Sequence, residues 1–122
     1  MKSADKGIKR ILKAFTYSYD GFRSTFKSEA AFRQELLFCL CFGTTLFFLP
    51  LPLTHLILLL FSLFFILFAE LLNTAIETLV DRIGEEYNEL SKKAKDIGSL
   101  LVMLSFINFF VLAGIIFYSA FS

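Results

Sequence analysis

Long uncharged hydrophobic runs alternate with charged segments along this chain. Residues 36–69 and 97–122 carry no formal charge. A helix needs about 20 residues to cross the hydrocarbon core of a bilayer, so the first run is too long for a single crossing. Pro50 and Pro52 interrupt it, because proline cannot continue a helix. The pattern therefore predicts three membrane-spanning helices, at about residues 30–49, 53–83 and 91–120.

The first 28 residues follow a different pattern, in which apolar positions recur at spacings of four and three. This spacing places the apolar side chains on one face of a helix, with Lys and Arg off that face. In a membrane protein, such a helix lies in the interface between lipid and water. We therefore expect an interfacial helix within residues 1–28, with an apolar face formed by Ile8, Leu12, Phe15, Tyr19, Phe22 and Phe26.

The composition is that of a small membrane protein. The chain has 122 residues, of which 57% are hydrophobic and 17 are Phe. This is too apolar for an ordinary soluble domain. We therefore expect an all-α membrane protein, a single domain over residues 1–122, with an amphipathic surface helix followed by three transmembrane helices.

The distribution of charge predicts the orientation in the membrane. All Lys and Arg lie at positions 2–33 or 82–95, and three spans put these two segments on the same side. The positive-inside rule makes that side cytoplasmic. We expect a multi-pass protein with a cytoplasmic N-terminus, whose second and third spans extend into the cytoplasmic layer.

Polar residues share one helical face at the cytoplasmic end of the second predicted span. Steps of three and seven residues turn a helix by about −60° and −20°, so Glu70, Asn73, Glu77 and Asp81 lie on the same side. Ionisable residues so close to the hydrocarbon are costly and suggest a function. The alternative is a helix that simply leaves the membrane with a solvated acidic face.

Carboxylates beside lysines favour chemistry with Mg²⁺ and phosphate. The sequence contains no P-loop, no protein-kinase motif and no G-x-S-x-G nucleophile motif. Glu70 and Glu77 lie about 10.5 Å apart along the helix axis, too far to bind one Mg²⁺ together at its ligand distance of about 2.1 Å. Glu77 could instead bind a metal with Glu29 from another helix, leaving Glu70 to meet a lipid hydroxyl. These roles describe phosphoryl transfer from a soluble nucleotide to a lipid at the interface.

The sequence also predicts structural roles for several other residues. Gly84 is expected to end the second span, and Ser91 is expected to cap the start of the third. Asn108 is polar within the third span, so we expect it to hydrogen-bond to another helix. Gly98 and Ser99 are small residues that allow two helices to approach closely.

Long segments of the chain carry a family resemblance. They are residues 29–35 (EAAFRQE), 70–77 (ELLNTAIE), 81–84 (DRIG), 86–87 (EY) and 94–99 (AKDIGS), together with the surface helix containing Arg10, Lys13, Ala14, Tyr17 and Ser18. These segments closely resemble the bacterial integral-membrane diacylglycerol kinase family. The resemblance implies a homotrimeric helical bundle in the bacterial inner membrane, which phosphorylates diacylglycerol to phosphatidic acid with ATP and Mg²⁺.

The same resemblance implies roles for individual residues. Glu70 matches the general base with Asn73 nearby, and Glu29 and Glu77 match the carboxylates that hold the metal and nucleotide. The expected nucleotide contacts are Arg10, Tyr17, Glu29, Glu77, Glu86, Tyr87, Asn88, Lys95 and Asp96. The expected contacts with the lipid substrate are Arg10, Ala14, Tyr17, Ser18, Ala31, Arg33, Gln34, Glu35, Glu70 and Ser99. The chain departs from the family at Asn88, where relatives often have His, and at Lys92-Lys93, which replaces a Gly-Arg-like pair.

Two alternatives remain at this point, and neither involves nucleic acid. A related branch of the family phosphorylates undecaprenol, although residues 30–35 and 81–84 look more like the diacylglycerol branch. Outside the enzymes, the chain could be a non-catalytic helical subunit of a larger membrane complex. This interpretation is disfavoured by the presence of the whole set of candidate site residues, Glu29, Glu70, Asn73, Glu77, Lys95 and Asp96.

Overall fold

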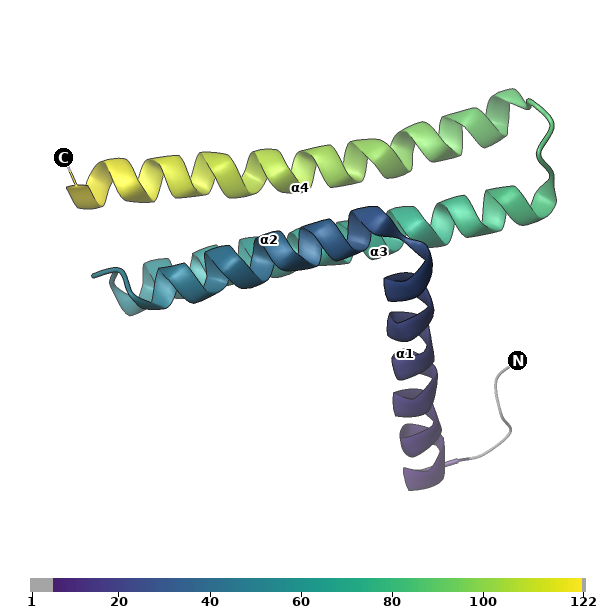
Figure 1. Cartoon of the computed structure of the whole chain (residues 1–122), viewed down its shortest axis with the longest axis horizontal. Coiled ribbons are helices and arrows are strands. Elements are labelled where there is room, and N and C mark those ends of the chain that lie inside the picture. The colour runs from purple at the N-terminus through teal and green to yellow at the C-terminus, as the bar shows by residue number, and fades with distance from the viewer. Residues whose placement is uncertain (1–5, 122) are drawn as a thin grey trace.

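Four helices account for almost all of the chain in the computed structural model, which describes residues 6–121 (Figure 1). They are α1 (Ile8–Ser28), α2 (Ala30–Phe47), α3 (Leu53–Ile83) and α4 (Glu89–Phe121), and no strand occurs within residues 6–121. By length and composition, α2, α3 and α4 can each cross a membrane. The expected all-α membrane fold, with a surface helix followed by three spans, is confirmed.

The α2, α3 and α4 helices lie side by side, and α1 leaves them at a steep angle (Figure 1). The α3 and α4 helices form an antiparallel pair with the most extensive contact in the structure, and α2 packs against α3. The α1 helix contacts mainly α2. With the bundle upright in a bilayer, this angle places α1 along the membrane surface, and its apolar side chains are exposed there.

The turn between α2 and α3 follows from its two prolines. The α2 helix ends at Phe47, two residues earlier than the predicted end at position 49. A residue that precedes proline is driven out of the helical conformation, so Leu49 cannot remain helical before Pro50. The α3 helix then begins directly after Pro52, which stands at its N-cap.

The cap of α4 differs from the expectation. The helix begins at Glu89 rather than at about position 91, and the Asn88 side chain caps it. Asn88 Oδ1 accepts hydrogen bonds from the backbone N–H groups of Leu90 (2.9 Å) and Ser91 (3.2 Å). The prediction that Ser91 is the cap is therefore wrong, because Asn is an equally strong capping residue and stands three positions earlier. The α3 helix ends just before Gly84, as expected, although that glycine is extended (φ 166°).

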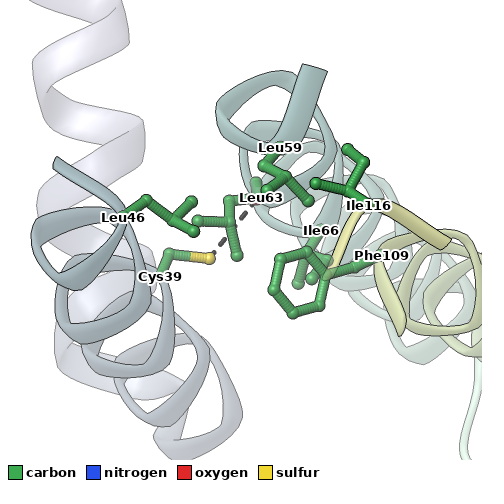
Figure 2. Packing of buried hydrophobic residues seen from close by; sticks show 7 residues of the cluster. All are labelled: Cys39, Leu46, Leu59, Leu63, Ile66, Phe109 and Ile116. Carbon is green, nitrogen blue, oxygen red and sulfur yellow. Dashed lines mark hydrogen bonds between the residues drawn. The ribbon is translucent and has the colours of Figure 1, made fainter. Parts of the chain in front are cut away.

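A small cluster of apolar side chains joins α2, α3 and α4 (Figure 2). It takes two residues from α2, three from α3 and two from α4, namely Cys39, Leu46, Leu59, Leu63, Ile66, Phe109 and Ile116. The thiol of Cys39 donates to the carbonyl oxygen of Leu63 at 3.3 Å, which links α2 to α3. Between membrane helices, such packing and hydrogen bonding hold the bundle together, because lipid is as apolar as the side chains.

An elbow at Glu29 sets the direction of α1. Glu29 ends α1 and begins α2 in an extended conformation. The guanidinium of Arg33 donates from Nη1 to the carbonyl oxygens of Phe26 (2.6 Å) and Lys27 (3.1 Å), so it satisfies free carbonyls at the end of α1. The rings of Phe22 and Phe32 pack edge to face across the elbow, with their centroids 5.7 Å apart. These contacts fix the surface helix relative to the first span.

The Asn88 cap can be tested by substitution. Replacing Asn88 with Ala should lower the free energy of unfolding by about 0.5–2 kcal/mol, because two N–H groups lose their acceptor. Asn88→Asp should retain most of the stability, and Ser91→Ala should change it by less than about 0.5 kcal/mol. The measurement is reversible unfolding of the purified variants in mixed micelles. A larger loss in Ser91→Ala than in Asn88→Ala would contradict the observed cap.

Candidate functional site

In the C-terminal half of α3, the polar face turns toward the interior of the bundle. Glu70 is only 5% exposed, while Asn73 and Glu77 are half-buried one and two turns further along. The side chain of Glu70 therefore lies among packed helices rather than in a solvated face. This excludes the simplest alternative, in which the acidic face only reaches out to water.

Glu35 of α2 stands beside Glu70. The two carboxyl groups lie beside each other across the α2–α3 interface. The second oxygen of Glu35, Oε2, is buried and has no hydrogen-bond partner in the part of the chain that the structure describes. The residue expected to contact lipid thus directly touches the expected base, and it retains a buried acceptor that a ligand hydroxyl would satisfy.

Asn73 and Glu77 form a second pair on the same helix. Asn73 Nδ2 donates to Glu77 Oε1 at 3.4 Å, a long hydrogen bond across one helical turn. The oxygen of the same amide, Oδ1, is buried without a partner among residues 6–121. The amide thus orients the carboxylate of Glu77, which is the expected metal ligand.

Glu29 lies at the elbow between α1 and α2, and it interacts electrostatically with Glu70, as Glu77 does. Residues 6–121 contain no group of three or more Asp, Glu, His or Cys that would enclose a metal. Mg²⁺ does not need such a cage, because it commonly binds through one or two carboxylates and completes its shell with water and substrate phosphates. The hard oxygen donors of Glu29 and Glu77 therefore fit a Mg²⁺ ion brought by a nucleotide.

A pocket of about 610 Å³ opens where α3 turns into α4. We call it the loop pocket, and its size is within the range of small-molecule sites. It is lined by Val80, Asp81, Gly84, Glu85, Glu86, Tyr87, Asn88, Ser91, Lys92, Lys95 and Asp96. The structure thus brings together five of the expected nucleotide contacts, Glu86, Tyr87, Asn88, Lys95 and Asp96.

Ion pairs organise the walls of the loop pocket. Lys95 Nζ lies 2.7 Å from Asp81 Oδ1, an ion pair between α4 and α3. Lys92 Nζ lies 2.6 Å from Asp96 Oδ2, one turn apart on α4. Lys95 also interacts electrostatically with Glu77, so it stands between the loop pocket and the carboxylates deeper in the bundle.

The residues of α1 are not brought to the loop pocket within one chain. Arg10, Ala14, Tyr17 and Ser18 lie on the exposed surface helix, which leaves the bundle at a steep angle and does not line the pocket (Figure 1). The hydroxyl of Ser18 donates to the carbonyl oxygen of Ala14 at 2.9 Å. Of the other expected lipid contacts, Ala31, Gln34 and Ser99 are exposed near the elbow and on α4.

Two participants were missed by reasoning from the sequence. Asp81 was placed on the polar face of α3 without a role, and the structure makes it the partner of Lys95. Gly98 was treated as a packing residue, and the structure places it directly against Asn73. Charge complementarity between the end of α3 and the start of α4 could have indicated the pairing of Asp81 with Lys95. Nothing in the sequence indicates the register of α4 against α3 that places Gly98 beside Asn73.

Comparisons with known proteins agree on one family. The family model described as prokaryotic diacylglycerol kinase matches residues 16–117. A protein named diacylglycerol kinase from Escherichia coli (strain K12) is 42% identical over 107 residues, which is 88% of each chain. Proteins of the same name from Haemophilus influenzae and Pseudomonas aeruginosa are 43% and 44% identical, and the matches cover 81% and 76% of this chain and 84% and 76% of the relatives.

Proposed function

The chain belongs to the prokaryotic diacylglycerol kinase family, and we propose that it phosphorylates diacylglycerol to phosphatidic acid with ATP. We place the reaction at the cytoplasmic surface of the bacterial inner membrane, with the N-terminus in the cytoplasm. The positive-inside distribution of Lys and Arg supports this orientation. The observation that carries the proposal is the buried Glu70 at the apolar end of a face whose polar end leads to the loop pocket.

The lipid side of the reaction is assigned to Glu70 and Glu35. Both belong to helices that cross the membrane, and their carboxyl groups are in contact. A diacylglycerol has a polar glycerol with one primary hydroxyl above two apolar chains. Glu70, at the boundary between hydrocarbon and polar layer, suits that hydroxyl, while the orphaned oxygen of Glu35 suits a second hydrogen bond. The other proposed lipid contacts are Arg10, Ala14, Tyr17, Ser18, Ala31, Arg33, Gln34 and Ser99.

The nucleotide side is assigned to the loop pocket and the residues between it and Glu70. Glu86, Tyr87, Asn88, Lys95 and Asp96 line the pocket, and Arg10 and Tyr17 are proposed to complete it from α1. Glu29 and Glu77 would hold Mg²⁺, which supplies neutralisation of the phosphate charge when it is bound. The loop pocket carries more carboxylates than lysines, so a nucleotide would bind with its metal rather than as a bare anion.

The proposed reaction is an in-line transfer with one proton removed. Glu70 accepts the proton of the lipid hydroxyl as its oxygen bonds to the γ-phosphorus and the bond to the β–γ bridging oxygen breaks. Lys95 and Arg10 offset negative charge on the phosphates, and ADP leaves with the electron pair of the broken bond. Positioning and electrostatic stabilisation account for most of the rate of phosphoryl transfer, so a small site is sufficient.

A homotrimer is part of the proposal. Asn108 stands in the uncharged part of α4, and it is exposed in the single chain. A polar amide facing hydrocarbon is costly, and in membrane bundles such groups usually meet another helix. An oligomer would provide that partner, which supports the assembly implied by the family.

The test is transfer of labelled phosphate from ATP by the purified protein in micelles. The proposal expects Mg²⁺-dependent labelling of diacylglycerol, with undecaprenol as a second substrate in a parallel reaction. Faster labelling of undecaprenol would assign the chain to the other branch of the family. A folded protein that labels neither lipid would support the non-catalytic alternative.

The proposed base is tested by two substitutions at position 70. Glu70→Gln keeps the size of the side chain and removes its basicity, so turnover should fall at least about 100-fold, since general-base catalysis is typically worth about 10²–10⁴-fold. Glu70→Asp should fail comparably, because a displacement of about 1 Å can cost about 100-fold. The affinity for Mg-ATP should remain unchanged in both. Near-normal turnover in Glu70→Gln would remove Glu70 from the role, and loss of nucleotide affinity would move it to the metal site.

A further inference from the structure

The α4 helix packs tightly against α3 at the candidate site, where Gly98 faces Asn73. Gly98 is buried on the face of α4 that packs against α3, in line with Ser105, Phe109 and Ile116. A Cβ atom at Gly98 would lie 3.3 Å from Cγ and 3.5 Å from Cα of Asn73, and it would overlap the amide oxygen Oδ1. The amide of Asn73 therefore occupies the space that any other residue at position 98 would need.

The contacts of this amide leave it one orientation. Its Nδ2 donates to Glu77 Oε1, and its Oδ1 is buried against Gly98 without a hydrogen-bond partner. Turning the amide over would place a carbonyl oxygen against a carboxylate, which is repulsive. Moving it away from α4 would break the hydrogen bond that orients Glu77. The position of Glu77 therefore depends on the space that Gly98 leaves open.

The other glycines show that this arrangement is specific to position 98. Gly114 stands on the same helix, and a Cβ there would meet nothing within 4 Å. A Cβ at Gly43 would make only ordinary contacts at 3.8 Å with Leu60 and Leu63. A general need for close helix packing does not explain Gly98. The atom that a Cβ at position 98 would displace is the polar end of a side chain in the site.

We propose that Gly98 is a positioning residue for phosphoryl transfer, which holds Glu77 in place for Mg-ATP by leaving room for the Asn73 amide. The proposal rests on the proposed function, in which Glu77 is a ligand of the metal–nucleotide complex. It assigns Gly98 no contact with substrate or cofactor. Partners that orient a metal ligand typically contribute 10–100-fold to metal affinity or activity, about as much as Gly98 is expected to contribute.

The experiment compares Gly98→Ala with Gly114→Ala in the full-length protein in mixed micelles. Both substitutions gain the same helix propensity, so they differ in the contact made by the new methyl group. Gly98→Ala should raise the KM for Mg-ATP about 10–100-fold while the KM for diacylglycerol stays the same. Gly114→Ala should leave both constants unchanged. Equal behaviour of the two variants would overturn the proposal.

A double-mutant cycle separates positioning from general packing. Asn73→Ala removes the atoms that the new methyl group would overlap, so Gly98→Ala should have no further effect on the KM for Mg-ATP in that background. If Gly98→Ala fails to fold by itself, the comparison of Asn73→Ala with the double variant still decides, because a further rise in KM would contradict the proposal.

A separate measurement tests the proposed function itself. Glu77→Gln must raise the KM for Mg-ATP if Glu77 holds the metal–nucleotide complex. Wild-type protein without lipid kinase activity, or Glu77→Gln with an unchanged KM, would overturn the proposed function. An effect of Glu77→Gln without an effect of Gly98→Ala would overturn only the role of Gly98.

Discussion

An ionisable side chain at the level of lipid hydrocarbon must be sheltered by protein, because lipid cannot solvate it. Glu70 meets this constraint on α3, where α2 brings Glu35 to its carboxyl group and the packed helices leave it only 5% exposed. The α4 helix extends this shelter toward the C-terminal end of α3, since Gly98 packs against Asn73 and Lys95 forms an ion pair with Asp81. The rest of the site depends on this packing.

The structure separates two environments along one helix. Glu70 is buried about one turn beyond Ile66, a member of the apolar cluster. About three turns further along α3, Asp81 lines an open pocket with charged walls. A reaction that joins a membrane lipid to a water-soluble nucleotide needs both environments within reach of each other. The intervening Asn73 and Glu77 are the residues that connect them.

The fold was largely predictable from the pattern of charge and hydrophobicity. The two prolines and the uncharged runs predict the three membrane-spanning helices, and the four-and-three spacing from Ile8 to Phe26 predicts α1. Local competition between good caps was not predictable, so the sequence favoured Ser91 where Asn88 forms the cap. The candidate site residues on α3 also followed from helical periodicity, because they share one element. Contacts between elements did not: the pairing of Glu35 with Glu70 and of Gly98 with Asn73 depends on how helices slide and rotate against each other, which sequence periodicity leaves undetermined.

The site depends on α4 of the same chain packing against the polar face of α3, with Gly98 against Asn73. The direct measurement is disulfide formation in Asn73→Cys/Gly98→Cys, in a protein whose native cysteines are replaced by Cys39→Ala and Cys41→Ala. A Cβ at Gly98 would lie 3.5 Å from Cα of Asn73, which is close enough for a disulfide with its Cβ atoms about 3.5–4.5 Å apart. We expect rapid oxidation to a bond within one chain, so that the protein migrates as a monomer on a non-reducing denaturing gel and loses both free thiols. Covalent dimers on that gel, or two thiols that remain free under oxidising conditions, would contradict it.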